Sequence, residues 1–580
     1  MTRSTTLVIL GLLAVAISAV AVLAFTRNSP PAGDGTGPIS TPPTPPGTPW
    51  FDDVTDRVGI TFTHDPGPVP GNYSLPQING SGCVAADLDG DGKPDLLFLT
   101  YGGPTSKSTN KLYKQKDDKT FEDVSAGSGL DFPGLCTGVA VGDMNNDGKP
   151  DILIAMYGGV RLFLNLGGMK FRDVSEAAGV TSRGWATSAS FVDYNRDGRL
   201  DLVVVHGVDV DPSWVCNNPD GAPGYCSPNV FPGTVTRLFR NESSGNEVRF
   251  TDVSLASGLG KLPGPGLGVV CGDFNGDGWP DIFVANDARP NRLWINQQDG
   301  TFVDEAPTRG AALNAMGQAW AGMGVARGDV DGDGLQDILV SHLGIETNTL
   351  WMQGPRGLFR DRTGPSGLSS GGWRGTGWGI TLSDFNHDGK LDAVVVNGRV
   401  SRGPNANAAL GAFWSAYSER NQVFAGIESG QFRDRSEEEP ALCGTPNVAR
   451  GLAVSDLDGD GALDLVVTTI GSRARVYRNV CPTRGHWLLV RCVEPTLGGR
   501  DACGAEVTVI AGGARWSRVA DPGGSFLSSS DPRAHFGLGD VAKVDTIEVL
   551  WPEGQRERFP GGPTDRMITL RKGDGQAVGP

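Results

Sequence analysis

Acidic residues recur at alternate positions in a short stretch that the chain repeats. The first copy, "DLDGDGKPD", runs from Asp87 to Asp95 and holds four carboxylates in nine residues. Without a counterion, carboxylates packed so closely would repel one another strongly. Seven copies share the form D-x-[DN]-x-D-G-x-x-D; we call them loop 1 to loop 7, and they begin at Asp87, Asp143, Asp193, Asp273, Asp329, Asp384 and Asp456.

This pattern predicts a calcium loop. Side chains at positions 1, 3 and 5 face one centre if the chain curls, and Gly at position 6 permits the sharp turn. The carbonyl of position 7 turns inward and Asp at position 9 completes the ligand set. Such hard, flexible oxygen ligands suit Ca²⁺, whereas Mg²⁺ prefers a stricter octahedron. The predicted metal-binding residues are Asp87, Asp89, Asp91, Lys93, Asp95, Asp143, Asn145, Asp147, Lys149, Asp151, Asp193, Asn195, Asp197, Arg199, Asp201, Asp273, Asn275, Asp277, Trp279, Asp281, Asp329, Asp331, Asp333, Leu335, Asp337, Asp384, Asn386, Asp388, Lys390, Asp392, Asp456, Asp458, Asp460, Ala462 and Asp464.

Two other readings of the acidic loops fit less well. An EF-hand needs Glu at position 12 and flanking helices, but position 12 is Phe98 in loop 1 and Ile154 in loop 2. A solvated turn would not recur seven times at one place of a repeat. Up to seven Ca²⁺ would bring the formal net charge from −16 to about −2. Because each loop gives its ligands to one ion, we expect these sites to be structural.

A second motif, F-x-D, sets the number of strands in each repeat. An aromatic strand precedes all copies but the first, and an apolar run follows each acidic loop. One repeat therefore reads as four strands, and seven repeats predict a seven-bladed β-propeller in an all-β protein. The seven copies start at Phe51, Phe121, Phe171, Phe250, Phe302, Phe359 and Phe432.

The two motifs are out of phase by one strand. Phe51 precedes loop 1, and no F-x-D follows the last aromatic strand, "RVYRN" at residues 475–479. We therefore expect the strand at Phe51 to complete the seventh blade beside those residues, so that the chain's beginning closes the ring and leaves no sheet edge exposed. A glycine lies five residues before six of the loops, at Gly82, Gly138, Gly268, Gly324, Gly379 and Gly451.

The N-terminus and the cysteines place the protein outside the cytoplasm. Residues 1–27 contain an uncharged apolar run and predict a signal peptide or an N-terminal membrane anchor; residues 28–49 form a Pro/Gly/Thr-rich linker. Cys216 and Cys226 flank "NNPDGAPGY" and predict a disulfide. Weaker pairings are Cys83 with Cys136, Cys443 with Cys481 and Cys492 with Cys503, which leaves Cys271 as a buried free thiol. The alternative is that several of these cysteines are unpaired, small core residues.

The repeats resemble the FG-GAP/VCBS units of integrin α-subunit propellers and, more closely, those of the cartilage-acidic-protein-like family. The C-terminal "GAEVTVIAGGARWSRV" and "SFLSSSDPRAHFGLGDVAKVDTIEVLWPEG" resemble the ASPIC/UnbV domain that follows such propellers. The resemblance implies a propeller over residues 50–480, an ASPIC/UnbV-like domain over 481–577, and calcium ligands at positions 1, 3, 5 and 9 of each loop. The chain departs from that pattern in its cysteine-bearing insertion at residues 206–235.

The C-terminal region carries its own strand pattern. The segments "HWLLVRC", "AEVTVIAG", "ARWSRVA", "TIEVLWP" and "RMITLRK" predict a small antiparallel β-sandwich. His535 stands alone there, and we expect it to be structural.

Several catalytic signatures are missing from the sequence. There is no HExxH, Walker or CxxC motif, and the six histidines are scattered. The tripeptide Arg327–Asp329, an RGD, begins loop 5 with its aspartate, so we expect it to be unavailable for cell attachment. The net charge of −16 argues against nucleic acid, and a membrane contact would come only through the N-terminal segment.

Three functions fit these features. The first is an exported, non-enzymatic binding or adhesion module for an extracellular protein or glycan, with the insertion at 206–235 as its contact surface. The second is an enzyme acting on polysaccharide in the propeller funnel, by analogy of fold alone. The third is a structural subunit of a surface complex. In each case the protein is secreted or associated with the cell envelope.

Overall fold

The computed structural model describes residues 47–69, 73–218, 221–245, 247–369 and 373–579. The predicted leader and most of the predicted linker lie outside these residues. Among the helices that are described, none is both long enough and apolar enough to cross a membrane.

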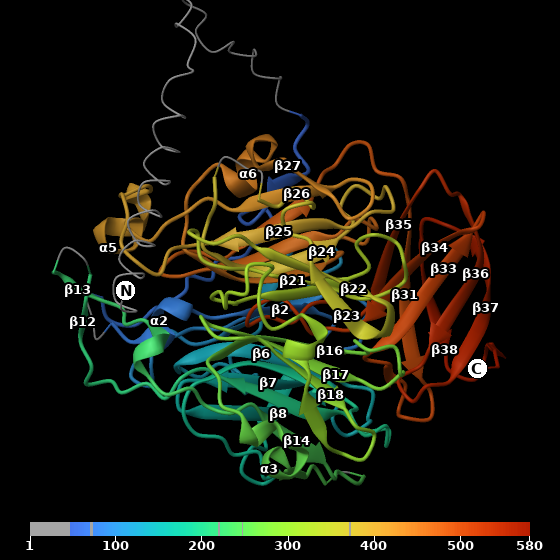
Figure 1. Cartoon of the computed structure of the whole chain (residues 1–580), viewed down its shortest axis with the longest axis horizontal. Helices are drawn as coiled ribbons and strands as arrows, with labels where there is room; N and C mark the ends of the chain where they lie inside the picture. The colour runs from blue at the N-terminus through green and yellow to red at the C-terminus, as the bar shows by residue number, and fades with distance from the viewer. Residues whose placement is uncertain (1–46, 70–72, 219–220, 246, 370–372, 580) are drawn as a thin grey trace, which may run out of the picture. The chain divides into compact units, whose positions relative to one another are not determined.

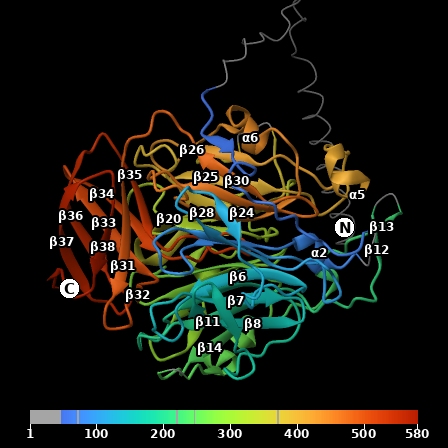
Figure 2. The same ribbon diagram turned by 180° about the vertical axis from the view of Figure 1, so that it is seen from behind.

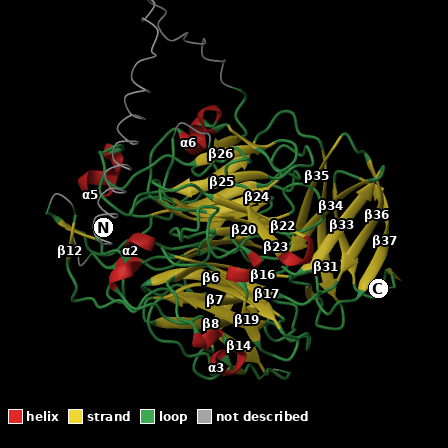
Figure 3. Ribbon diagram, viewed as in Figure 1, coloured by secondary structure: helices red, strands yellow, loops and turns green. Residues whose placement is uncertain are grey.

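Seven antiparallel sheets of four strands follow one another along the chain (Figures 1 and 3). We number them blade 1 to blade 7 by the acidic loop that each contains. Blades 1 to 3 comprise β2 (Cys83–Ala86), β3 (Asp95–Phe98), β4 (Lys111–Gln115) and β5 (Phe121–Asp123); β6 (Cys136–Gly142), β7 (Asp151–Met156), β8 (Gly159–Gly167) and β9 (Lys170–Asp173); and β10 (Ala186–Val192), β11 (Asp201–His206), β14 (Arg237–Asn241) and β15 (Phe250–Asp252).

Blades 4 to 7 keep the same order of strands. They comprise β16 (Gly266–Gly272), β17 (Asp281–Asn286), β18 (Arg292–Asn296) and β19 (Phe302–Asp304); β20 (Val325–Gly328), β21 (Asp337–Val340), β22 (Thr349–Gly354) and β23 (Leu358–Asp361); β24 (Gly377–Ser383), β25 (Asp392–Asn397), β26 (Gln422–Gly426) and β27 (Phe432–Asp434); and β28 (Ala449–Ser455), β29 (Asp464–Thr469), β30 (Arg475–Asn479) and β1 (Phe51–Asp53).

The first strand of the chain is the outer strand of the last blade. β1 pairs antiparallel with β30, with Phe51 opposite Asn479 and Asp53 opposite Tyr477. This is the pairing that the phase of the two motifs predicts. The carboxylate of Glu439, which is fully buried, accepts hydrogen bonds from the backbone amides of Trp50 and Phe51 at 2.9–3.1 Å. The carboxylate of Glu439 therefore holds the beginning of β1 in place.

The cores of the propeller lie between neighbouring blades. One of them joins Ala85 and Phe98 of blade 1 to Val466 and Val476 of blade 7. The inner strand β2 contacts both β6 and β28, so the seven inner strands succeed one another around an axis. The repeated glycine permits this approach: a Cβ added at Gly138 would lie 2.1 Å from the carbonyl oxygen of Thr187 in the next blade. This contact gives a packing reason for the glycine that precedes six loops.

The C-terminal domain is a sandwich of two sheets. One sheet has β31 (His486–Glu494) between β35 (Ala534–Gly539) and β38 (Arg566–Arg571), with β32 (Arg500–Asp501). The other has β34 (Ala514–Ala520), β33 (Ala505–Ala511), β36 (Lys543–Leu550), β37 (Arg556–Pro563) and β39 (Gln576–Ala577). The five predicted strands are present, but the sandwich is mixed rather than antiparallel, because β31 and β38 run parallel.

The propeller has two unlike faces. The C-terminal strands lie on one side of the blades, and α5 with the short strands β12 and β13 lies on the opposite side (Figures 1 and 2). We call them the capped face and the insertion face. The elements outside the blades are β12 (Cys216–Asn217), β13 (Pro223–Gly224), α2 (Leu75–Asn79), α3 (Ser254–Ser257), α4 (Ala306–Arg309), α5 (Gly411–Ser415), α6 (Pro440–Cys443), η1 (Pro228–Val230), η2 (Leu259–Lys261), η3 (Pro355–Gly357), η4 (Ala408–Leu410) and η5 (Ser436–Glu438).

The weaker disulfide predictions are wrong. Cys216 and Cys226 are bonded, but the other seven cysteines, including Cys443 and Cys481, are free. Cys83 packs into the core between blades 7 and 1, whereas Cys136 packs between blades 1 and 2, so the two thiols lie on opposite faces of blade 1. Cys492 faces the sandwich core and Cys503 faces the propeller. Cys271 is a buried free thiol, as predicted.

Candidate metal centres and the surfaces around them

The acidic loops curl in the way their sequence predicts. In loop 1 the carboxylate of Asp87 accepts hydrogen bonds from the amides of Gly90 and Gly92 at 2.7 and 2.8 Å, and Asp91 accepts one from the amide of Lys93 at 3.0 Å. Gly92, at position 6, has φ of 87°, which only glycine adopts readily. All seven loops repeat the bond from the position-6 amide to the position-1 carboxylate.

Aspartate at position 9 has a second role that the sequence analysis missed. Asp95 is fully buried; one of its oxygens accepts the amide of Leu88 at 3.1 Å and the other accepts the amide of Gln115 on β4 at 3.0 Å. The same two bonds occur in every loop, so this residue ties the loop to the third strand of its blade.

The donor set fits a divalent cation. In three loops, three carboxylates offer oxygens within 4.8 Å of one another. The other four loops have Asn at position 3, which supplies an amide oxygen instead. Two of these inward side chains, Asp89 and Asn145, hold a buried Oδ1 that has no hydrogen-bond partner. An ion would satisfy such an oxygen. The three carboxylate groups are Asp87 with Asp89 and Asp95, Asp329 with Asp331 and Asp333, and Asp456 with Asp458 and Asp460.

Burial makes these carboxylates hard to ionise without a cation. It raises the pKa of Asp95 to about 7 and those of Asp281 and Asp337 to about 8, and neighbouring carboxylates add to the effect. Basic side chains compensate in part: Lys114 pairs with Asp89, and Arg478 lies 3.1 Å from Asp458. A bound divalent ion would favour the ionised form far more strongly.

The C-terminal domain covers most of the loops. A Cβ added at Gly461 of loop 7 would lie 1.9 Å from the Trp487 ring, and one at Gly148 of loop 2 would lie 2.6 Å from the carbonyl oxygen of Gly498. Similar contacts join loop 3 to Leu497 and loop 6 to Trp516. These four loops therefore contact the C-terminal domain, although Asp147, Asp197 and Asp460, at position 5 of loops 2, 3 and 7, are exposed.

Three arginines of the C-terminal domain lie near the first aspartates of neighbouring loops. Each guanidinium favours the ionised form of its two carboxylates, against the larger effect of burial, which raises their pKa. The sequence analysis missed these arginines, and no motif marks them. Arg500 acts on Asp143 and Asp193, Arg518 acts on Asp329 and Asp384, and Arg533 acts on Asp456 and Asp87.

Loops 4 and 5 are more open. Asp273 and Asp277 of loop 4 and Leu335 of loop 5 line a groove of about 750 Å³ beside the edge of the C-terminal domain. The guanidinium of Arg196 stacks 4.4 Å above Trp279 at the side of this groove. The seven loops are thus unequal in their access to solvent.

The disulfide-bearing insertion reaches the centre of the insertion face. Tyr225 donates a hydrogen bond to Gln77 at 2.8 Å and packs edge-on against Tyr417 at 5.7 Å. At the outer end, Trp214 and Val215 are 52% and 73% exposed. The insertion therefore covers its neighbours with one part and presents apolar side chains to solvent with another.

Two side chains singled out in the sequence are structural, as expected. Arg327 of the RGD tripeptide pairs with Asp521 at 2.6 Å, both side chains are nearly buried, and Asp329 is buried within loop 5. The Nε2 of His535 lies 2.8 Å from the carbonyl oxygen of Gly461, which joins the C-terminal domain to loop 7.

Comparisons with known proteins agree with this architecture. The family model described as FG-GAP-like repeat matches residues 87–154, 143–204, 273–340 and 329–395, and the model described as ASPIC and UnbV matches residues 496–577. The chain is a propeller of FG-GAP-like repeats followed by an ASPIC/UnbV domain, as its resemblances predicted.

Curated relatives carry one name. The chain is 31% identical to cartilage acidic protein 1 of Xenopus tropicalis over 57% of its length and 48% of the relative. It is 27% identical to cartilage acidic protein 1 of Homo sapiens over 83% of its length and 61% of the relative. The chain thus spans about half to three fifths of the length of the relatives it matches.

The solved structures that match the chain share little sequence with it. A lectin of Agrocybe aegerita, described by its specific recognition of non-reducing terminal N-acetylglucosamine, is 16% identical, with a TM-score of 0.38 over 63% of this chain and 84% of that one. The BP39L lectin of Burkholderia pseudomallei is 10% identical, with a TM-score of 0.37 over 68% of this chain and 98% of that one.

Proposed function

We propose that this protein is an exported, calcium-binding recognition module that holds an extracellular protein or glycan without chemical change. The calcium ions, up to seven, would stiffen the loops rather than touch the ligand. The observation that carries the proposal is the set of seven acidic loops that share one hydrogen-bonded turn, three of which bring three carboxylates within 4.8 Å of one another. The inward, unpartnered oxygens of Asp89 and Asn145 support it.

The insertion face would carry recognition. The C-terminal domain covers much of the opposite face, whereas the disulfide-tied insertion presents Trp214 and Val215 to solvent. Exposed aromatic and apolar side chains on a rigid base are typical of protein and sugar contact surfaces. Tyr225 anchors the insertion to the propeller, so the exposed side chains are held in place before a ligand arrives.

The test begins with calcium alone. We expect titration of EGTA-stripped protein to show uptake of several Ca²⁺ per chain and a rise in melting temperature that Mg²⁺ does not reproduce. Asp147→Asn and Asp197→Asn, which change position 5 of two loops, should each lower the stoichiometry by about one. Absence of calcium uptake would refute the metal part of the proposal.

Ligand recognition needs a separate test. The protein is screened on glycan and surface-protein arrays with Ca²⁺ and with EGTA. Each captured ligand is recovered, and its molecular mass is measured by mass spectrometry. Capture without change in mass supports a binding module; release of a shortened polysaccharide supports the enzyme instead. Trp214→Ala is the surface variant, and Leu166→Ala, a similarly exposed residue on β8 of blade 2, is its control.

A further inference from the structure

A segment of the C-terminal domain enters the centre of the propeller. Residues 521–533 leave the sandwich after β34 and return to it at β35. Ser529 forms a parallel bridge to Val84 of blade 1, and Ser525 forms an antiparallel bridge to Val325 of blade 5. The segment therefore lies between inner strands that belong to distant blades. We call it the plug.

Backbone hydrogen bonds hold the plug on several sides. The amide of Ser529 donates to Cys83 at 3.0 Å and that of Ser525 donates to Val325 at 2.7 Å; each inner strand returns a bond at 3.1 Å. The carbonyl oxygen of Leu527 accepts the amide of Val139 in blade 2 at 3.0 Å. The plug thus supplies partners to amides that the inner strands turn toward the axis.

Serine hydroxyls of the plug form hydrogen bonds with the inner strands of two further blades. Ser525 accepts the amide of Ile380 in blade 6 at 3.3 Å, and Ser530 accepts the amide of Val454 in blade 7 at 3.1 Å. Together with the backbone bonds, five of the seven inner strands bond to the plug. Small hydroxyl side chains suit this position because they fit beside backbone and still satisfy its polar groups.

The tip of the plug passes through to the insertion face. Phe526 is fully buried with its ring 5.0 Å from that of Trp378, and Leu527 is 2% exposed. Both belong to a core that also contains Ile78 and Trp414, from segments of the insertion face. The plug therefore joins the C-terminal domain to residues at the far end of the channel.

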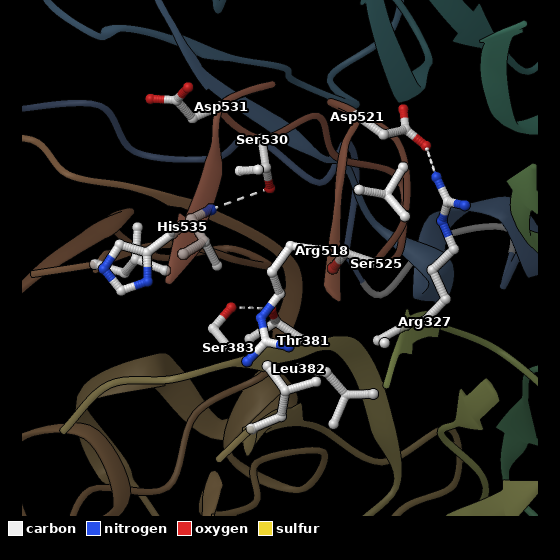
Figure 4. A pocket seen from close by; sticks show the side chains of 18 of the residues that line it. Arg327, Thr381, Leu382, Ser383, Arg518, Asp521, Ser525, Ser530, Asp531 and His535 are labelled. Carbon is white, nitrogen blue, oxygen red and sulfur yellow. Dashed lines mark hydrogen bonds and ion pairs between the residues drawn. The ribbon is translucent and has the colours of Figure 1, made fainter. Parts of the chain in front are cut away.

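The fit around the plug is close. A Cβ added at Gly82 would lie 1.7 Å from the carbonyl oxygen of Leu527. Ser525 and Leu527 have φ of 67° and 58°, a conformation that non-glycine residues keep only where the surroundings impose it. The base of the plug is fixed by Asp521, which pairs with Arg327 at 2.6 Å. A cavity adjoins the plug, and Arg518 extends toward the side of it that is lined by Thr381 and Ser383 (Figure 4).

We propose that the plug is an internal ligand of the propeller: it fills the axial channel, bonds the inner strands to one another, and makes the propeller and the C-terminal domain a single cooperative unit. The channel is then neither a passage nor a substrate funnel, and external ligands meet only the outer surfaces. This inference does not depend on calcium.

The experiment uses the full chain with a protease recognition sequence inserted between Pro482 and Thr483, which are exposed. After cleavage, the wild-type fragments should co-elute from a sizing column. Gly82→Ala obstructs the plug from the propeller side, and Phe526→Ala removes its tip from the other. We expect each variant to release at least about tenfold more C-terminal fragment. Gly364→Ala, whose Cβ would meet nothing within 4 Å, is the matched control.

Two outcomes would overturn the proposal: release of the fragment from the cleaved wild type without denaturant, or retention in both variants equal to that of Gly364→Ala. If the variants fail to fold, hydrogen exchange of the uncut wild type decides. The amides of Ser525 and Ser529 should exchange as slowly as those of the inner strands; exchange about a hundredfold faster would show a plug that opens on its own.

Discussion

Each acidic loop combines two kinds of aspartate that share a motif but differ in surroundings. Asp91, at position 5, is exposed and accepts one amide, whereas Asp95, at position 9, is fully buried and accepts two amides from different segments. The first kind can offer a ligand oxygen to a cation with little effect on the loop's own structure. The second holds the blade together whether or not a cation is bound.

Substitution separates the two roles. We expect Asp95→Asn to lower the free energy of unfolding by about 1–3 kcal/mol even in EGTA, because an amide NH₂ would then face a buried backbone N–H. Asp91→Asn should cost at most about 1 kcal/mol in EGTA, since it loses only exposed ion pairs. It should instead reduce the stabilisation by calcium. Denaturant unfolding at about pH 8, above the pKa of about 7 for Asp95, measures both. Equal losses in EGTA would contradict the division of roles.

At the scale of the element, the insertion and the first strand are held by few contacts. Among its described residues the insertion is held by the short pair β12 and β13, one disulfide, the packing of Tyr225, and a bond from the amide of Asp209 to the carbonyl oxygen of Pro232. The first strand has three residues, and the amide of its first residue, Phe51, donates a hydrogen bond to the carboxylate of Glu439. We expect one change in the insertion to act locally, and one change at the anchor of the first strand to act on the whole ring.

The disulfide should act locally. In Cys216→Ser with Cys226→Ser we expect the global free energy of unfolding to change by no more than about 0.5 kcal/mol, since neither sulfur lies in a blade. Residues 209–231 should become sensitive to protease, because the unlinked loop regains about 2–3 kcal/mol of conformational freedom. Limited proteolysis with mass spectrometry reads this out, and dithiothreitol-treated wild type should match. Unchanged protection would mean that packing alone holds the insertion.

The anchor of the first strand should act globally. Glu439→Gln leaves the buried guanidinium of Arg435 without its closest partner, now 2.6 Å away, and weakens the bonds to Trp50 and Phe51. We expect a loss of about 3–5 kcal/mol in thermal or chemical unfolding. Glu437→Gln, in the same turn but 82% exposed, should change stability by less than about 1 kcal/mol. Similar losses in both variants would contradict the anchoring role.

At the scale of the molecule, the C-terminal domain turns seven repeated loops into unequal ones. Loops 2, 3, 6 and 7 meet residues of that domain, whereas loops 4 and 5 open into a groove. The plug, meanwhile, binds inner strands of five blades and so couples the domain to the ring as a whole. We therefore expect exchange of the proposed ions and opening of the ring to depend on the same domain.

Release of calcium should occur in two phases. Ions in loops 4 and 5 should leave within the first phase on mixing with EGTA, because these loops open into a groove, and those in the loops that contact the C-terminal domain more closely should leave more slowly. Stopped-flow with a fluorescent chelator resolves the phases. Asp277→Asn with Asp333→Asn should reduce only the fast amplitude, whereas Asp147→Asn with Asp388→Asn should reduce only the slow one. A single phase in the wild type would contradict this account.

The sequence alone determined the repeating part of this protein. Spacing within nine residues specifies the turn of each acidic loop. Two motifs that recur once per blade specify the strands and the pairing of the strand at Phe51 with residues 475–479. The C-terminal strands and the bond between Cys216 and Cys226 could be predicted for the same reason: each follows from residues close together in the chain.

Only the tertiary structure decided the contacts that do not repeat from one blade to the next. Nothing near Gly82 in the sequence indicates Leu527 as its neighbour, and nothing near Arg518 indicates Asp329 and Asp384. Cys83 and Cys136 lie on the inner strands of successive blades, and each packs toward the blade before it, so blade 1 stands between the two thiols. Local spacing encodes turns and strands; which distant surfaces meet depends on how the finished blades and the sandwich pack.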